Sequence, residues 1–294
     1  KILTETKIIL FTDFYNFKVF KTAGIQTMIY LLRKEVPSNN YNLRYSFLKN
    51  DLISYNELVN FLDFDSSKLI YDKFCLDFNN SDYQNSFITF NNPKIENVLN
   101  SIISERIVYL LNNEVAQGIV FPQNKLNKKS AKKLGDNYKL NDGVFQINNN
   151  ELNELCLDKN ELSLIKPFYT STELSRFYGN ENNKEWVIYT ESDIKNTINL
   201  YPNIKTHLDN FSEIITSDNQ PYGLHRSRDE RFFQGEKIFS LRKNIIPQFT
   251  YTNFDCYVSQ TFYSIKTDRF NLQYLTVILN SKLIAFWLRY KGKM

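Results

Sequence analysis

Basic and aromatic residues alternate around a Tyr-Gly-Leu-His turn in residues 220–263, a combination that suits contact with duplex DNA. Guanidinium groups are planar forks that match phosphate oxygens and guanine edges, and a turn lets the backbone and an imidazole approach a groove closely. A solvated strand face shows the same alternation, so both interpretations stay open at this point. The residues of this tract that can make such contacts are Tyr222, His225, Arg226, Arg228, Arg231, Arg242 and Lys243.

Positive charge is concentrated in the last third of the chain. Residues 201–294 carry 13 Lys and Arg against 8 Asp and Glu, whereas residues 1–200 carry 23 against 24. The imbalance favours contact between the last third and a polyanion. A second basic stretch, residues 125–134, predicts an exposed loop or short helix that either lies near phosphate or is solvated surface. Its candidate residues are Lys128, Lys129, Lys132 and Lys133.

Motifs for catalysis and for cofactor binding are missing from the sequence. No two of the eight glycines have a Gly-x-Gly spacing, so no phosphate-cradling loop, dinucleotide fingerprint or adenosyl-cofactor loop can be written. Asn91-Asn92-Pro93 is the nearest match to an Asn-Pro-Pro-aromatic clamp for a flipped base, but Lys94 follows in place of the second proline. We therefore expect no catalytic residue and no bound cofactor within this chain.

Cysteine usage and hydropathy limit the protein class. The three cysteines lie far apart and have only two histidines to help them, so they form no zinc-ligand spacing and no metal is expected. Apolar runs stop well short of about 18 residues and the first residues lack a signal-peptide pattern, so neither membrane insertion nor secretion is indicated. The sequence predicts a reduced, cytoplasmic protein. Both ends of the sequence suggest a piece of a longer polypeptide.

Apolar spacing predicts the elements that must position the candidate residues. Residues 7–34 show strand patterns around a turn, and residues 25–32 are so uniformly apolar that a strand covered on both faces is predicted. Residues 94–113 show the clearest amphipathic helix. The other main predicted helices are residues 201–215 and 271–290, and the other main predicted strands are residues 114–121, 239–241, 249–251 and 256–265.

Short motifs in a fixed order extend over nearly the whole chain. Those near its start are Asp13-Phe14, Phe17-Lys-Val-Phe20 and Ala23-Gly-Ile-Gln-Thr-Met-Ile-Tyr30. Those further along are Gln117-Gly-Ile-Val-Phe-Pro122, Asp142-Gly-Val-Phe145, Ile165-Lys-Pro167, Tyr222-Gly-Leu-His-Arg226, Tyr257-Val-Ser-Gln260 and Leu279-Asn-Ser-Lys-Leu283. The first group resembles the last strands of the methyltransferase domain, and the second the target-recognition part, of adenine-N6 DNA methyltransferases of the TaqI-like and type IIG restriction-modification class.

The resemblance implies a parent enzyme that transfers a methyl group from S-adenosylmethionine to an adenine amino group. Many enzymes of this class also carry a nuclease, which would add Mg²⁺ as a cofactor. Because the cofactor loop and the base clamp are missing here, the resemblance implies recognition of double-stranded DNA for this chain, next to an upstream methyltransferase domain that flips the target base.

The candidate residues gain roles from this resemblance. Arg226 and Arg228 become candidates for bidentate contact to guanine or for phosphate anchoring, and His225 and Tyr222 for contact to base edges. Gln260 can read adenine, or it can be a strand-interior glutamine bonded to a neighbouring strand. Arg231, Arg242, Lys243 and the four lysines of residues 128–133 are expected to position the DNA backbone.

The predicted fold class is α+β. The predicted domains are residues 1–45 as C-terminal strands of a methyltransferase domain, residues 46–113 as a helical connector, and residues 114–294 as a mixed α/β target-recognition domain that is truncated at its C-terminus. Two other functions stay open. One is a protein-assembly module of a restriction complex without its own DNA specificity, and the other is a stand-alone enzyme such as a nuclease.

Overall fold

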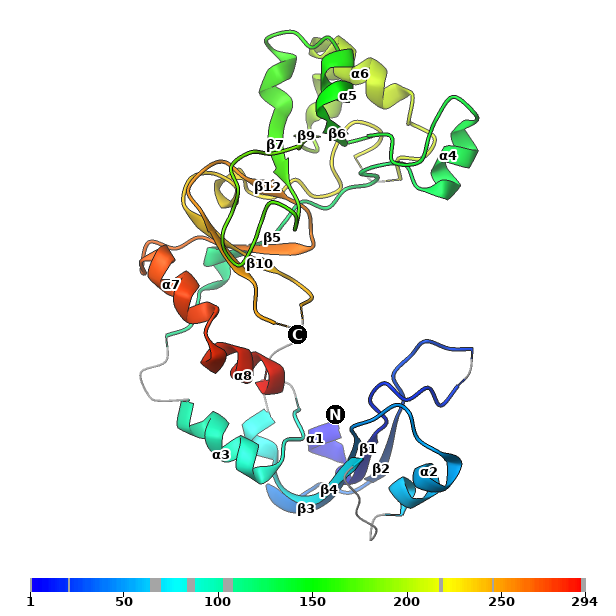
Figure 1. Cartoon of the computed structure of the whole chain (residues 1–294), viewed down its shortest axis with the longest axis vertical. Helices are drawn as coiled ribbons and strands as arrows, with labels where there is room; N and C mark the ends of the chain where they lie inside the picture. The colour runs from blue at the N-terminus through cyan, green and yellow to red at the C-terminus, as the bar shows by residue number, and fades with distance from the viewer. Residues whose placement is uncertain are drawn as a thin grey trace. The chain divides into compact units, whose positions relative to one another are not determined.

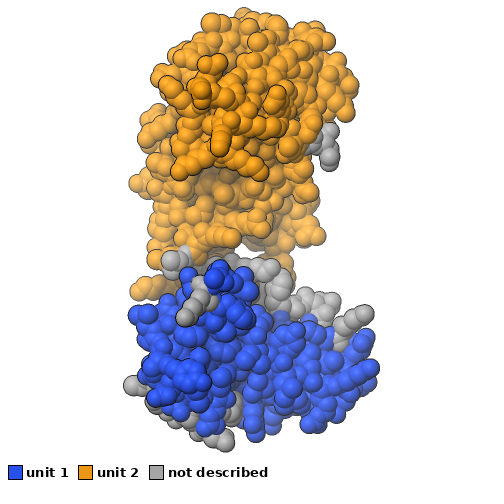
Figure 2. Space-filling model, turned by 90° about the vertical axis from the view of Figure 1, so that its right-hand side faces the viewer, with its two compact units in different colours: residues 1–107 blue, residues 108–294 orange. Residues whose placement is uncertain are grey.

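The structure is a computed structural model that describes residues 2–20, 22–63, 70–83, 88–102, 108–216, 219–244 and 246–291. It divides into two compact units, residues 1–107 and residues 108–294, which are coloured separately in Figure 2. Helices and three sheets mix along the chain, which confirms the predicted α+β class. The division at residue 107 falls inside the predicted connector of residues 46–113.

The first unit is built on a four-stranded sheet with the strand order β2-β1-β3-β4. β1 pairs antiparallel with β2 and parallel with β3, and β3 pairs antiparallel with β4 over nine residues. Leu43 and Leu48 of β3 are fully buried in its core. The strands are β1 (Lys7–Asp13), β2 (Met28–Arg33), β3 (Asn40–Leu48) and β4 (Tyr71–Asn79), and the helices are α1 (Ile2–Glu5), α2 (Tyr55–Leu62) and α3 (Pro93–Ile102).

β2 differs from the strand that the sequence predicts. Residues 25–32 were expected to be covered on both faces, but β2 is an edge strand whose four consecutive apolar residues are all 45–58% exposed: Met28, Ile29, Tyr30 and Leu31. No part of the described unit covers them. The prediction of coverage is therefore wrong for this chain taken alone, although the pairing of residues 7–13 with residues 28–33 is confirmed.

The amphipathic helix predicted for residues 94–113 is shorter in the structure. α3 runs from Pro93 to Ile102, residues 103–107 lie outside the described residues, and residues 108–111 are not helical. The carboxylate of Glu114 accepts a hydrogen bond from the Leu111 backbone N–H at 2.6 Å. In the predicted helix, the Leu111 N–H would instead donate to a backbone carbonyl four residues earlier.

The second unit contains a five-stranded sheet, order β5-β13-β10-β11-β8, and a four-stranded sheet, order β12-β7-β9-β6. Figure 1 labels β5 and β10 of the first of these sheets and all strands of the second. A shared core that includes Phe145, Phe239 and Tyr257 joins elements of both sheets. The strands are β5 (Val115–Gln117), β6 (Gln146–Asn148), β7 (Ile165–Tyr169), β8 (Phe177–Tyr178), β9 (Glu185–Ile188), β10 (Lys237–Leu241), β11 (Phe249–Thr252), β12 (Tyr257–Val258) and β13 (Phe262–Ile265). The helices are α4 (Lys128–Leu134), α5 (Asn149–Glu154), α6 (Pro202–Asp209), α7 (Leu272–Leu279) and α8 (Lys282–Lys291).

Residues 271–290 form two helices instead of the single helix that the sequence predicts. Asn280 separates α7 from α8, and its side-chain amide is bound on both sides by the backbone of Phe249. The Phe249 N–H donates to Asn280 Oδ1 at 3.0 Å, and Asn280 Nδ2 donates to the Phe249 carbonyl at 2.7 Å. Because a long-range bond to β11 fixes this position, apolar spacing along the helix does not show the break. α7 packs through Leu272 on Ile238, Phe249 and Ile265 of the sheet.

Candidate nucleic-acid interface

Three segments that are far apart in the sequence converge at one end of the five-stranded sheet. Residues 117–120 lie between residues 226–228 and residues 258–260. Val120 and Arg226 exchange two backbone hydrogen bonds of 3.0 and 3.1 Å, while Ile119 bonds the backbone of Val258 and Gln260 at 2.9 and 2.7 Å. The two arginines of the sequence motif are therefore fixed next to the turn that follows β12.

Gly118 makes this convergence possible. A Cβ atom at this position would lie 2.2 Å from the Ser259 carbonyl oxygen and 2.6 Å from the Val258 carbonyl oxygen. Only a residue without a side chain allows two backbone segments to approach this closely.

Arg228 is the most constrained of the sequence-predicted residues. Its guanidinium donates from Nε to the Gly118 carbonyl at 3.3 Å and from Nη2 to Gln117 Oε1 at 3.0 Å. Its backbone φ is 77°, in the left-handed region that non-glycine residues rarely adopt. The hydroxyl of Tyr189, which is 5% exposed, donates to the Arg228 carbonyl at 2.9 Å. Hydrogen bonds thus hold both the strained backbone and the side chain of Arg228.

Three side chains form a row across the neighbouring strands. Gln117 of β5, Tyr263 of β13 and Ser240 of β10 are directly paired partners, so their side chains lie on one face of the sheet. Tyr263 is 38% exposed. Sequence reasoning missed Gln117 and Tyr263 as functional candidates. The signal for Gln117 was the glycine next to it, which marks a close backbone approach at the end of a strand.

Arg242 and Gln260 extend the group at the same end of the sheet. The Arg242 N–H donates to the Thr261 carbonyl at 2.7 Å, next to Gln260. Gln260 is exposed in the turn between β12 and β13, so the alternative of a strand-interior glutamine is wrong. His225 and Lys243 are exposed neighbours of Arg226 and Arg242. We call the following residues the sheet-end cluster: Gln117, His225, Arg226, Arg228, Arg242, Lys243, Gln260 and Tyr263.

The sheet-end cluster carries positive charge without counter-charges. Within the described ranges, none of the four cations Arg226, Arg228, Arg242 and Lys243 has a carboxylate within ion-pair distance. Burial and then the nearby guanidinium of Arg226 lower the pKa of Arg228. Both effects disfavour the charged form of Arg228, and an anionic or electron-rich ligand would stabilise it.

Two of the sequence-predicted residues lie elsewhere and are already paired. Arg231 forms an ion pair with Asp229 at 2.8 Å and donates to the Asn113 carbonyl at 2.6 Å. Asn113 precedes the first residue of β5, whereas Gln117 of the cluster is the last residue of that strand. The Tyr222 hydroxyl donates to Asp209 at 2.7 Å, and Asp209 also pairs with Lys205. These contacts give Arg231 and Tyr222 structural partners that the sequence does not show.

The lysines of residues 128–133 form the exposed side of α4. Asn127 caps this short helix by accepting the N–H groups of Lys129 and Ser130. Lys128, Lys129 and Lys132 are exposed, and Lys133 donates to the Glu213 carbonyl at 2.5 Å. Of the predicted alternatives, an exposed loop or a short helix, the structure shows the helix, and its lysines form a second positive surface in the same unit as the sheet-end cluster.

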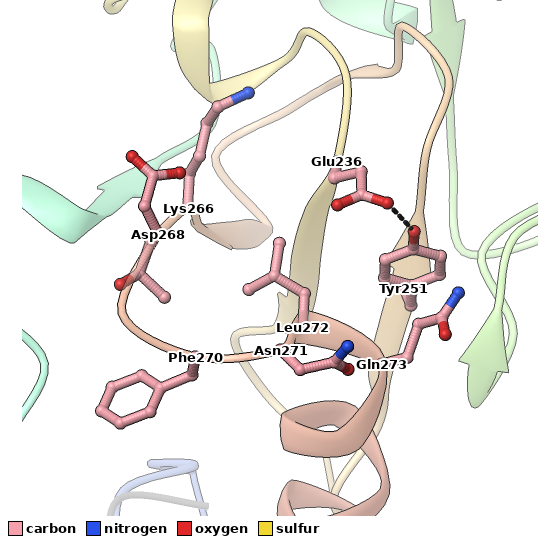
Figure 3. Close-up of a pocket in the computed structure, with 9 residues that line it drawn as sticks. Glu236, Tyr251, Lys266, Asp268, Phe270, Asn271, Leu272 and Gln273 are labelled. Carbon is pink, nitrogen blue, oxygen red and sulfur yellow. Dashed lines mark hydrogen bonds between the residues drawn. The ribbon is translucent and has the colours of Figure 1, made fainter.

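A pocket of about 400 Å³ lies at the opposite end of β10 from the sheet-end cluster (Figure 3). Glu236 and Asp268 contribute carboxylates, and the Tyr251 hydroxyl donates to Glu236 at 2.6 Å. The pocket's single ammonium group, on Lys266, donates to the Gln234 carbonyl at 2.5 Å. With two carboxylates against one ammonium, this pocket is unsuited to phosphate groups.

Within the residues that the structure describes, no group of three or more His, Cys, Asp or Glu side chains is placed to hold a metal ion. Over the same ranges, no helix has the length and apolar character needed to cross a membrane.

Comparison with known families and structures agrees with the resemblance in the second unit. Residues 166–292 match the family model of the TaqI-like C-terminal specificity domain. This range includes Arg226, Arg228, Arg242 and Gln260, whereas Gln117 and α4 precede it. No curated protein sequence matches the chain.

Two of the solved structures that match this chain come from restriction systems. One is the Type IIL restriction-modification enzyme MmeI in complex with DNA, with 11% identity, a TM-score of 0.52, and coverage of 98% of this chain and 33% of MmeI. The other is the type IIG restriction endonuclease BpuSI, with 9% identity, a TM-score of 0.31, and coverage of 98% of this chain and 34% of BpuSI. The chain thus spans about a third of the length of each enzyme, and the likeness to MmeI shows a shared fold.

Proposed function

We propose that this chain recognises a specific sequence of duplex DNA for a restriction-modification enzyme. The observation that carries the proposal is the sheet-end cluster. Its four cations, which have no ion-pair partner among the described residues, lie beside Gln117 and Gln260 on a frame fixed by backbone bonds. The match to a TaqI-like specificity domain over residues 166–292 supports the same function.

The residue types of the cluster suit the two kinds of DNA contact. Arginine forks match guanine edges or phosphate, and glutamine amides match the adenine edge. Arg242 and Lys243, in the exposed β10–β11 turn, suit phosphate contact, and His225 can approach a base edge next to Arg226. The lysines of α4 add phosphate contacts that carry no sequence information.

The parent enzyme that we infer is an adenine-N6 DNA methyltransferase of type IIG, acting in the cytoplasm. S-adenosylmethionine does not fit the chain described here, because its glycines offer no adenosyl-cofactor loop. We therefore assign methyl transfer, the cofactor and any Mg²⁺-dependent nuclease to other parts of the parent, and we expect this chain to be inactive alone.

β2 supports an upstream methyltransferase domain as the partner of the first unit. Its apolar residues are exposed at a sheet edge, and an edge strand of this kind pairs readily with a further strand. The same exposed strand also favours the second candidate function, an assembly module of a restriction complex that binds protein and has no DNA specificity of its own.

Selection from a randomised duplex pool by the 294-residue chain tests the proposal. We expect enrichment of a short asymmetric site, with binding that weakens steeply between about 50 and 200 mM salt. The double variant Arg226→Ala with Arg228→Ala is expected to lose the base preference while it unfolds at the same temperature. Arg231→Ala is the matched control, because its guanidinium is already paired away from the cluster.

Two outcomes would contradict the proposal at different levels. Unchanged site preference in the double variant would exclude these arginines as readers of the sequence, while sequence recognition by the chain would stand. Absence of DNA binding by the wild-type chain, together with binding of a methyltransferase domain, would favour the assembly module instead.

A further inference from the structure

We propose that Gln117 is a positioning residue that fixes Arg228 as the base-reading fork of the interface, whereas Arg226 contacts phosphate. This inference rests on the proposed function in DNA recognition. The sequence motif gives Arg226 and Arg228 the same possible roles, and the inference gives each arginine a different one. It also assigns a role to Gln117, which lies more than 100 residues away from them in the sequence.

The side-chain amide of Gln117 is bound at both of its ends. Its Oε1 accepts from Arg228 Nη2 at 3.0 Å, and its Nε2 donates to the Gln260 carbonyl at 3.1 Å. A rotated amide would place its NH₂ group against the guanidinium, donor against donor. The carbonyl of Gln260 therefore fixes which end of the amide faces Arg228.

The backbone of Arg228 is bound as firmly as its side chain. A φ of 77° costs a non-glycine residue free energy, so this conformation persists only where surrounding contacts enforce it. The Tyr189 hydroxyl supplies such a contact at the Arg228 carbonyl, and the Gly118 carbonyl supplies another at Nε. Strain of this kind is concentrated at binding sites.

The remaining donors of Arg228 form a fork without an acceptor among the described residues. A guanidinium has five N–H groups, of which Gly118 and Gln117 take two. The other three lie on Nη1 and Nη2, the pair of nitrogens that bonds guanine O6 and N7 side by side. Both protein acceptors are neutral, and no carboxylate of the described residues lies within ion-pair distance of this half-buried charge.

Arg226 has the opposite properties. Its backbone is fixed by Val120, but its side chain is exposed and makes no hydrogen bond to any described residue. A flexible cation suits phosphate, which accepts from many directions, whereas a fork of fixed direction suits the edge of one base. The two arginines carry the same charge, but hydrogen bonds hold the guanidinium of Arg228 in one orientation, whereas that of Arg226 has no such bonds to the described residues.

Gln117→Leu and Gln117→Glu test the positioning role in the 294-residue chain. The leucine variant keeps the side-chain size but releases Arg228, so we expect about tenfold or greater loss of discrimination at one base pair. Its affinity for a scrambled duplex and its salt slope should stay within about twofold of wild type, because the phosphate contacts remain. The glutamate variant turns the contact into an ion pair, so we expect it to weaken binding to both duplexes.

Two controls separate positioning from loss of structure. Gln273→Leu is the same change at an exposed residue of α7, and it should alter neither discrimination nor salt slope. The Arg228 Nε–H signal in NMR spectra of the free protein should exchange faster with water in Gln117→Leu than in wild type. This second readout does not depend on DNA binding, so it also serves if the leucine variant is less stable.

Each outcome decides the inference. Loss of discrimination at one base pair together with faster Nε–H exchange supports it. If wild type selects a site and Gln117→Leu selects it equally well, positioning by Gln117 is wrong while the proposed function stands. If Arg226→Ala, rather than Arg228→Ala, abolishes discrimination, the division of roles is wrong. If the wild-type chain binds no DNA, both the inference and the proposed function are wrong.

Discussion

Glu114 and Arg269 form a two-point ion pair that ties the chain before β5 to the loop before α7. Arg269 Nε donates to Glu114 Oε1 at 2.7 Å, Arg269 Nη2 donates to Glu114 Oε2, and Thr267 donates to Oε1 at 2.5 Å. The pair is separated by 155 residues and closes the end of the five-stranded sheet that lies opposite the sheet-end cluster.

Acid should destabilise the second unit through this pair. The hydrogen bonds from Arg269 lower the pKa of Glu114 to about 2 from its usual 4.5. A carboxylate with a lowered folded-state pKa stabilises the fold fully above pH 4.5, and this contribution is lost as the pH falls from 4.5 to about 2. We expect Glu114→Gln to lower the unfolding temperature at pH 7, and the difference from wild type to shrink through that window. Glu213→Gln, which makes the same replacement at an exposed residue, is the control.

Lys237 should add a second rise of stability with pH, in the alkaline range instead of the acid one. It is fully buried, its Nζ donates to the carbonyls of Gly235 and Phe254, and burial lowers its pKa to about 8 from 10.5. The unfolded chain therefore binds more protons between pH 8 and pH 10.5, so stability increases with pH across this range. Relative to Lys237→Met, wild type should gain up to about 3 kcal/mol of unfolding free energy there, as measured with urea. A constant difference between the two proteins would show that the amine stays protonated in the fold.

Gly118→Ala should damage the frame of the interface itself. The new methyl group would overlap the backbone carbonyls of Val258 and Ser259, which cannot yield as a flexible side chain can. We expect a decrease of about 1–3 kcal/mol in unfolding free energy and loss of site selection. Gly24→Ala is the matched control, because no heavy atom of the described residues, apart from those of its own chain neighbours, lies within 4 Å of its added Cβ. If Gly118→Ala selects its site normally, recognition of DNA does not depend on the close approach of the three segments.

The lysines of α4 should affect affinity without affecting the recognised sequence. Replacing Lys128, Lys129 and Lys132 by glutamine removes exposed charge from a helix whose cap at Asn127 is retained. For every phosphate that these lysines neutralise in the wild type, the slope of log affinity against log salt should become shallower by about 0.9, equally for selected and scrambled duplexes. An unchanged slope would identify this helix as ordinary solvated surface.

The exposed strand β2 should tolerate charge in the isolated chain. Ile29 and Leu31 are 45% and 57% exposed, so Ile29→Lys with Leu31→Lys should change stability by about 0.5 kcal/mol or less. The same change should weaken binding to the methyltransferase part of the parent, which sedimentation velocity can measure. Val36→Lys, at a residue 84% exposed outside the strands, should leave that binding intact. A large loss of stability would mean that β2 is already covered.

The sequence predicts the elements of this fold better than their ends and their contacts. Periodicity identified β1, β2, β10 and β11, because each is a single amphipathic or apolar run. It failed at Asn280, where bonds to Phe249 divide a helix, and at residues 256–265, where a turn at Gln260 divides a strand. These breaks depend on partners that are distant in the sequence, so local patterns do not contain them.

The same limit applies to the candidate site. Charge and motif order pointed to Arg226 and Arg228, and the structure fixes both next to residues 117–120. Sequence reasoning included Tyr222 as a candidate for base edges and Arg231 as a candidate for the DNA backbone, since their partners Asp209, Asp229 and Asn113 become visible only after folding. Gln117 was missed because the residue that it contacts, Arg228, lies 111 positions away in the sequence.

The convergence of three distant segments has a consequence for engineering. A loop that carries its own specificity can be transplanted as one cassette, but a graft of the Tyr222–Arg228 motif alone would leave Gln117 and the β12–β13 turn behind. The transplanted arginines would then lack the acceptor that orients one of them. New specificities on this frame should therefore come from coordinated single substitutions at residues 117, 228 and 260, with Gly118 left unchanged.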